Sequence, residues 1–78
     1  MRYSLKMPKV GDAVDTVVIM SVLVGIGDRV SNGQALLLVE TDKAQVEIPA
    51  HFSGVVREIL VSTGDEVSTG SPTFVIEG

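Results

Sequence analysis

The residue best suited to covalent chemistry in this chain is Lys43. Two apolar-rich segments, residues 35–40 and 44–48, meet at Asp42-Lys43. Two strand-like runs separated by a short polar break predict a β-hairpin, with the lysine at its tip. A primary amine on an exposed, rigid turn is a suitable attachment point for a carried group. We therefore predict that Lys43 is modified; the alternative is a solvated surface lysine with no specific role.

The other residue types offer little chemistry. The chain has no cysteine, which excludes a disulfide framework and thiol catalysis. Its single histidine, His51, cannot build a zinc site alone and has no partner that would make it catalytic. Asp65-Glu66 is one acidic pair, too little for a calcium cage. We expect no metal site and no catalytic residue.

Length and composition predict one small domain, residues 1–78. The 78 residues are 45% hydrophobic but contain few aromatic side chains, so Val, Ile and Leu must form the core. The net charge of −4 argues against nucleic-acid binding. The longest apolar run, residues 17–26, is too short to span a bilayer, and residues 2–6 lack the apolar core of a signal peptide. We expect a soluble chain without a membrane partner.

The segments that must position the hairpin all have strand character. Short runs rich in β-branched residues alternate with Gly, Asp and Asn turns, and no run has a helical period. The chain is therefore predicted to be all-β. The expected strands cover residues 4–8, 17–24, 29–31, 35–40, 44–48, 54–61, 66–68 and 73–77.

The second half of the chain repeats the first. Residues 27–33 (GDRVSNG) recur 37 positions later as residues 64–70 (GDEVSTG), and the match holds from Val18 to Glu40. Such a repeat predicts two related sheets packed face to face about a pseudo-twofold axis. Lys43 has no counterpart, because the equivalent position lies past residue 78. We therefore expect the termini at the end of the molecule opposite Lys43.

A two-residue loop at Asp42-Lys43 fixes the register of the hairpin. The predicted pairs are Thr41/Ala44, Glu40/Gln45, Val39/Val46, Leu38/Glu47 and Leu37/Ile48. Side-chain alternation then places four apolar residues on the core face and the polar residues on the wet face. Leu38 is the exception, since it falls on the wet face. Without a glycine the turn is expected to be type I, with Asp42 hydrogen-bonding locally.

At this point the sequence resembles a known family. Residues 40–44 (ETDKA) resemble the lipoylation motif of lipoyl domains from 2-oxo acid dehydrogenase complexes, in particular those of the dihydrolipoamide acyltransferase (E2) component. Residues 7–12 resemble the opening strand and loop of these domains. Gly27-Asp28, Gly64-Asp65 and Gly54-Val55-Val56 match further positions of the pattern. The resemblance covers nearly the whole chain.

The resemblance implies a fold and a function. The fold is a flattened barrel-sandwich hybrid of two four-stranded antiparallel sheets. Lipoate is amide-linked to Lys43 by a lipoate ligase or a lipoyl/octanoyl transferase. The domain then carries acyl groups and electrons between a thiamine-diphosphate-dependent decarboxylase (E1), the acyltransferase core (E2) and dihydrolipoamide dehydrogenase (E3), and is not itself an enzyme. The compartment would be the bacterial cytoplasm, or the mitochondrial matrix for a eukaryotic chain.

The resemblance also suggests which residues partners recognise. They are Glu40, Thr41, Asp42, Ala44 and Gln45 around the tip, and Asp12 and Asp15 in a loop expected beside the lysine. For Asp12 and Asp15 the alternative is a solvated loop, and for Glu40 and Gln45 it is ordinary cross-strand polar pairing. Asp42 is expected chiefly to shape the turn.

Two other functions stay open. A biotinyl carrier domain shares the fold, but typically has methionine on both sides of its lysine, where this chain has Asp42 and Ala44. An unmodified barrel-sandwich interaction module is the other alternative. Ile26 and Leu38 depart from the family pattern, and if exposed they predict a sticky surface.

Overall fold

The computed structural model describes residues 1–11 and 14–78. All regular secondary structure in these ranges is strand, arranged in two four-stranded sheets with the orders β1-β8-β6-β3 and β5-β4-β2-β7. Every recorded strand pair is antiparallel. The predicted fold class is therefore confirmed. The strands are β1 (Arg2–Lys6), β2 (Thr16–Val22), β3 (Arg29–Val30), β4 (Ala35–Glu40), β5 (Gln45–Pro49), β6 (Gly54–Ile59), β7 (Glu66–Ser68) and β8 (Pro72–Glu77).

The pseudo-twofold relation predicted from the repeat is also confirmed. It exchanges β2, β3 and β4 with β6, β7 and β8, and it exchanges the edge strands β1 and β5, so the two sheet orders become identical. Even the irregularities are duplicated, because β2 and β6 each bulge by one residue, at Met20 and at Arg57. The four glycines with positive φ, Gly27, Gly33, Gly64 and Gly70, form two pairs with the same spacing. A left-handed backbone at these turns explains why glycine recurs there.

The core lies between the two sheets and is aliphatic apart from Phe74 and Met7. Inward-facing residues alternate with outward-facing ones along parts of β2, β4, β6 and β8, and the alternation is interrupted at the register shifts in these strands. The fully buried side chains of greatest volume are Phe74, Ile19, Leu36, Leu37, Ile76, Val30, Val39 and Val56. The apolar run at residues 17–24 also suggested a buried strand, but β2 is buried on one face only, and Met20 is 37% exposed.

Several strand ends differ from prediction. β2 and β6 end at Val22 and Ile59, two residues early, because the chain then bends toward a turn that docks on the opposite sheet. In that crossing the Gly27 amide donates to the Val56 carbonyl, and the equivalent Gly64 amide donates to the Ile19 carbonyl, both at 2.8 Å. β1 begins earlier than expected, at Arg2, and β5 runs one residue further along the chain, from Gln45 to Pro49. Contacts between the sheets, which local patterns do not encode, set these bends.

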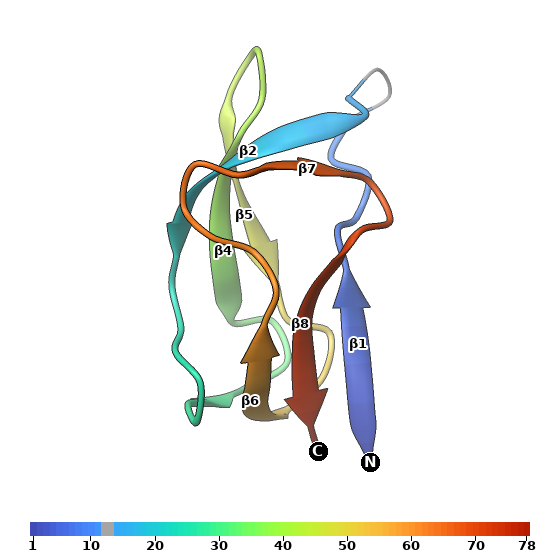
Figure 1. Ribbon diagram of the computed structural model, residues 1–78, viewed down its shortest axis with the longest axis vertical. Coiled ribbons are helices and arrows are strands. Elements are labelled where there is room, and N and C mark those ends of the chain that lie inside the picture. Colours follow the sequence, from blue (N-terminus) through green and yellow to red (C-terminus); the bar gives the residue numbers. More distant parts are fainter. Residues whose placement is uncertain (12–13) are drawn as a thin grey trace.

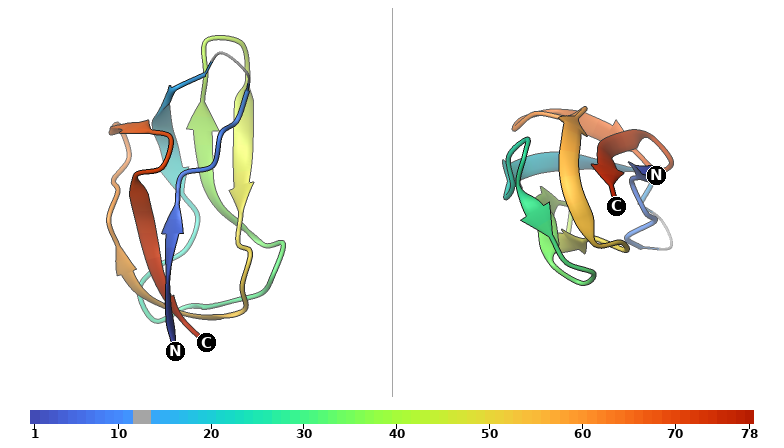
Figure 2. Two further views of the ribbon diagram at one scale, coloured as in Figure 1. Left: turned by 90° about the vertical axis from the view of Figure 1, so that its right-hand side faces the viewer. Right: turned by 90° about the horizontal axis from the view of Figure 1, so that it is seen from below.

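The β4–β5 hairpin loop and the chain termini lie at opposite ends of the molecule. The loop that joins β4 and β5 protrudes at the top of Figure 1, and both termini lie together at the bottom (Figures 1 and 2). The Met1 ammonium donates to the Gly78 carbonyl at 3.2 Å, and the Gly78 amide donates to the Met1 carbonyl at 3.0 Å. The termini therefore lie opposite the hairpin, as expected. We call the hairpin end the tip and the other end the base.

Candidate functional site

The hairpin that carries Lys43 has the predicted register. β4 and β5 pair Glu40 with Gln45, Val39 with Val46, Leu38 with Glu47 and Leu37 with Ile48. Leu37, Val39 and Ile48 are buried, whereas Val46, nearest the tip, is only half-buried. Leu36 is buried as well, which alternation did not predict. A register shift between Ala35 and Leu37 breaks the alternation at the far end of β4.

Thr41 holds the tip in shape. Its hydroxyl accepts hydrogen bonds from the Ala44 amide at 3.1 Å and the Lys43 amide at 3.3 Å, and donates to the Ala44 carbonyl at 3.0 Å. The Thr41 amide also donates to the Ala44 carbonyl, at 2.8 Å. A threonine hydroxyl that bonds neighbouring backbone groups in this way substitutes for part of a turn's own hydrogen bonding.

Asp42 does not have the role that the sequence suggested. No side-chain hydrogen bond of Asp42 is recorded in the described structure, and the local hydrogen bonds come from Thr41 instead. No non-glycine residue among those described has positive φ, so the turn does not use the primed geometry common in tight hairpins. The absence of glycine at the tip, noted from the sequence, is thus accommodated by the threonine hydroxyl. The sequence contains an indication of this role, because a threonine directly precedes the two loop residues.

Lys43 projects from this turn into solvent. It is exposed, and both ion pairs recorded among the described residues belong to Glu77 at the base, so neither involves the Lys43 amine. The tip backbone is therefore held by Thr41 and not by the lysine charge. An amine in this state is accessible to a modifying enzyme, and its charge can be removed without breaking an ion pair in the described structure.

Two open hollows flank the tip. One, of about 410 Å³, is lined by Thr41, Asp42, Lys43, Ala44 and Val46 of the hairpin and by Val10, Gly11 and Val14 of the loop between β1 and β2. The structure thus places these three residues of the loop beside the lysine. The second hollow brings Asp15 together with Glu40 and Asp42. Asp12, the other acidic residue predicted to contribute, lies outside the described residues.

The remaining candidate residues are solvent-facing. Ala44, Gln45, Glu40 and Asp15 are exposed, and His51 is exposed away from the tip. In the part of the chain that the structure covers, no group of three or more acidic or histidine side chains is arranged to hold a metal ion. Within the same residues there is no helix that would cross a lipid bilayer.

The two departures from the family pattern differ in exposure. Ile26 is 69% exposed, in the turn between β2 and β3 at the base. Leu38 faces outward as the register requires, but it is half-buried between Glu47 of β5 and Ser21 of β2. Ile26 is therefore an exposed apolar residue, whereas Leu38 is only partly accessible, and the two do not share one exposed apolar patch.

Comparison with known proteins places the molecule in a family. The family model described as "Biotin-requiring enzyme", which covers biotin and lipoyl attachment domains, matches residues 3–76. The chain belongs to the biotin/lipoyl attachment family. It is 46% identical over 77 residues to the dihydrolipoyllysine-residue acetyltransferase component of the pyruvate dehydrogenase complex of Haemophilus influenzae. That match covers 99% of this chain and 13% of the relative, so the chain spans about an eighth of that protein.

Solved structures of the family have the same fold. The lipoyl domain of the Azotobacter vinelandii 2-oxoglutarate dehydrogenase complex superposes with a TM-score of 0.73 and 26% identity, over 96% of both chains. The urea carboxylase of Kluyveromyces lactis superposes with a TM-score of 0.82 and 26% identity, over 99% of this chain and 6% of that one. The fold thus occurs in a lipoyl domain and in a carboxylase, whereas the sequence relative described above is an acetyltransferase component. This chain is a carrier-type domain of the lipoyl kind, similar to those of E2.

The residues present fit a group carried on Lys43. The amine is exposed, its backbone is fixed by Thr41, and the adjoining hollow has several apolar residues, Val10, Val14, Ala44 and Val46. A prosthetic group attached here would have an accessible, rigid base and an apolar surface beside it. Nothing else in the described structure needs the lysine in its charged form.

Proposed function

We propose that Lys43 carries a lipoyl group in amide linkage, and that this domain is the swinging-arm carrier of a 2-oxo acid dehydrogenase complex. The observation that supports this most is the position of Lys43: exposed, outside both recorded ion pairs, and at the tip of a hairpin fixed by Thr41, in the context ETDKA. The 46% identity to an acyltransferase component favours lipoate over other groups.

The chain's own residues supply position and access. The Thr41 hydroxyl fixes the backbone of Lys43 and Ala44, so the flexible part of the arm begins at the lysine side chain. When bound, a lipoyl group supplies a cyclic disulfide that accepts an acyl group together with two electrons. Tethering replaces bimolecular encounters with local ones at high effective concentration, which is the physical advantage of a carrier. The scaffold needs no catalytic residue for this task, because the redox chemistry belongs to the cofactor.

The proposed partners follow from the same role. They are the lipoate ligase or lipoyl/octanoyl transferase that modifies Lys43, then the thiamine-dependent decarboxylase, the acyltransferase core and dihydrolipoamide dehydrogenase. Residues 1–78 would act as one lipoyl domain of a longer chain, in a bacterial cytoplasm or a mitochondrial matrix. Glu40, Thr41, Asp42, Ala44 and Gln45, with Asp12 and Asp15, would form the surface that partners read.

A biotinyl carrier function is the second candidate. The superposition on urea carboxylase favours it, since the same backbone occurs in that enzyme. Against it, Lys43 lies between Asp42 and Ala44 and not between methionines. The two candidates differ in which ligase, lipoate or biotin, modifies Lys43.

Intact mass after co-expression tests the proposal. The domain is produced with a lipoate ligase and lipoate, and separately with a biotin ligase and biotin. We expect a gain of one lipoyl group that is lost in Lys43→Gln and kept in Lys6→Gln/Lys9→Gln, which alters the other two lysines. A gain of biotin alone would transfer the assignment to the second candidate. A folded domain modified by neither enzyme would rule out both carrier functions.

A further inference from the structure

The two sheets leave an open groove on one side of the barrel. β1 and β5 are outer strands of their sheets, and within the described chain they pair with β8 and β4 but not with each other. A groove of about 260 Å³ lies between them, on the side that faces the viewer in the left panel of Figure 2. It is lined by Leu5 and Ile48, which occupy equivalent places in the two sheets, so it lies across the pseudo-twofold axis. Its lining does not include Lys43.

The floor of this groove is apolar. Leu5, Leu36, Ile48 and Phe74 line it, and all four are buried in the core. Thr73 is the buried polar residue of the floor, and its hydroxyl donates to the Leu5 carbonyl at 2.9 Å. Because that proton is already used within the fold, the floor favours the apolar part of a ligand and leaves hydrogen bonding to the rim.

An aromatic pair fixes the groove toward the base. Phe52 lines it and is 38% exposed, and its ring stacks on that of Tyr3 with 4.3 Å between the ring centroids and 7° between the planes. The stack joins β1 to the corner between β5 and β6, so it holds the two sides of the groove at a set separation. A groove held in this way is formed before a ligand arrives, as small-molecule sites usually are.

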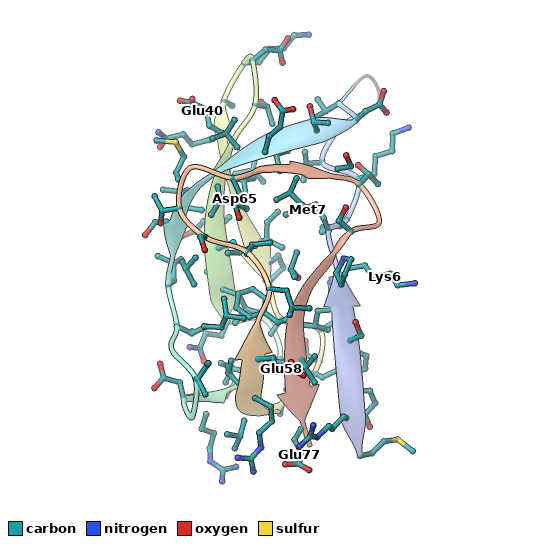
Figure 3. All side chains as sticks on the ribbon, viewed as in Figure 1. Lys6, Met7, Glu40, Glu58, Asp65 and Glu77 are labelled. Atoms are coloured by element: carbon teal, nitrogen blue, oxygen red, sulfur yellow. The ribbon has the colours of Figure 1, made fainter. Side chains whose placement is uncertain are left out.

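The rim of the groove carries cationic and N–H donor groups. Lys6 and His51 are the titratable side chains that line it, and no carboxylate is among the described lining residues. Neither side chain takes part in the ion pairs recorded in the described chain. Figure 3 shows Lys6 extending outward from the end of β1, so its ammonium is mobile at the mouth. A chain of net charge −4 repels anions in general, which makes this carboxylate-free rim a local exception.

Size and backbone chemistry limit what the groove can hold. Its volume of about 260 Å³ lies between the about 150 Å³ of a cavity that holds benzene and the about 300–1,000 Å³ of sites for drug-sized ligands. An added β-strand is disfavoured, because Pro8 and Pro49 line the groove and have no amide N–H to donate to a ladder. The groove therefore suits one small molecule with an apolar body and an anionic head.

We propose that the groove between β1 and β5 binds a free medium-chain aliphatic monocarboxylate. The alkyl chain lies on the floor formed by Leu5, Leu36, Ile48 and Phe74, and the carboxylate at the rim accepts hydrogen bonds from the Lys6 ammonium and the His51 ring N–H. Binding is non-covalent. The site is separate from the hairpin and goes beyond the carrier function, since it does not require modification of Lys43.

Octanoate is the probe that tests the site. It is titrated into the unmodified domain, and binding is followed by backbone amide NMR shifts and by the fluorescence of Tyr3, the only tyrosine in a chain without tryptophan. We expect saturable shifts at Leu5, Ile48, His51 and Phe52, unmoved amides at the tip, and a Kd of about 1–10 mM for a ligand of this size. Hexanoate should bind more weakly by about two- to fourfold for each methylene removed.

Matched ligands and variants separate the head from the tail. Octan-1-ol keeps the alkyl chain without the charge and should bind at least about fivefold more weakly than octanoate, because charge-assisted hydrogen bonds are lost. Lys6→Glu should weaken octanoate about tenfold, whereas Lys9→Glu makes the same charge change at an exposed lysine outside the lining and should stay within about twofold. His51→Phe keeps a ring but removes the N–H and should weaken octanoate about threefold.

Each outcome bears on the proposal. Shifts that stay absent or rise without saturation up to about 50 mM octanoate, well above the expected Kd, overturn the site. Equal affinity for octan-1-ol, or an equal loss in Lys9→Glu, shows apolar adsorption or net charge and overturns the carboxylate assignment. Shifts that follow protein concentration without octanoate identify a second copy as the occupant and overturn it too. The wild-type ligand series decides the matter if a variant fails to fold, and none of these results bears on the carrier function of Lys43.

Discussion

Replacing Thr41 by valine should loosen the tip without altering the sheet. Valine keeps the β-branched shape and the strand preference of threonine but removes the hydroxyl. The variant loses the hydrogen bonds that the hydroxyl accepts from the Lys43 amide at 3.3 Å and the Ala44 amide at 3.1 Å. It also loses the hydrogen bond that the hydroxyl donates to the Ala44 carbonyl at 3.0 Å. That carbonyl keeps the bond from the Thr41 amide at 2.8 Å, so no acceptor is left without a partner.

The magnitude follows from the exposure of the tip. A typical intramolecular hydrogen bond contributes about 1 kcal/mol net, and less where water can replace it. Because Lys43 and Ala44 are exposed, we expect a total loss of about 1 kcal/mol from the weak contacts together. For a domain of this size that corresponds to a fall in Tm of about 4–8 °C.

Hydrogen exchange and modification kinetics check the reasoning. In Thr41→Val the Lys43 and Ala44 amides should exchange faster than in wild type. Core amides such as that of Val39 should exchange faster only by the amount that the loss of global stability explains. Lipoylation at limiting ligase should be slower. Thr41→Ser keeps the hydroxyl and should stay close to wild type in all three measurements. If the valine variant retained wild-type exchange at Lys43 and Ala44, the hydroxyl would not be what fixes the tip.

Two further changes test other parts of the fold. In Gly54→Ala the new Cβ would collide with the Glu77 carbonyl oxygen and lie 2.9 Å from Ile76 Cγ2. Chemical denaturation should therefore show a loss of about 1–3 kcal/mol in the free energy of unfolding. The control is Gly25→Ala, whose Cβ meets nothing closer than 3.7 Å and which should change stability by under about 1 kcal/mol. A normal stability for Gly54→Ala would contradict the close approach. The hydrogen bond from Arg57 holds the pKa of Glu77 below its ordinary value, so Arg57→Met should raise that pKa in an NMR titration. The stability due to this pair is present above the unfolded-state pKa of Glu77 and is lost as pH falls through the folded-state pKa, so wild type and variant should converge in acid, and a difference that persisted there would contradict the assignment.

The hairpin could be predicted closely because two independent patterns constrain it. Alternation leaves one register in which Leu37, Val39 and Ile48 share a face, and a slip by one residue would expose all three. The repeat then fixes the pairing of the two halves. The bends that end β2 and β6 could not be predicted in the same way, because they depend on hydrogen bonds between sheets, such as Gly27 to Val56.

At the tip, sequence reasoning found the position but not the interaction that supports it. Asp42 was expected to bond locally because aspartate often does so in turns. Thr41 competes for the same backbone amides and takes them, since its hydroxyl can accept two N–H groups and donate to a carbonyl at once.

The pairing of the two chain ends at the base has a mechanical consequence. Met1 and Gly78 are hydrogen-bonded to each other, so any chain that continues from either end leaves from one point. The molecule extends 34 Å along its longest axis, from that point to the hairpin. If linkers on both sides let the domain pivot at the base, the whole fold acts as a stiff lever, and Lys43 at the opposite end moves through a wide arc. The reach of the arm is then set first by the rigid barrel and only afterwards by the lysine side chain and its cargo.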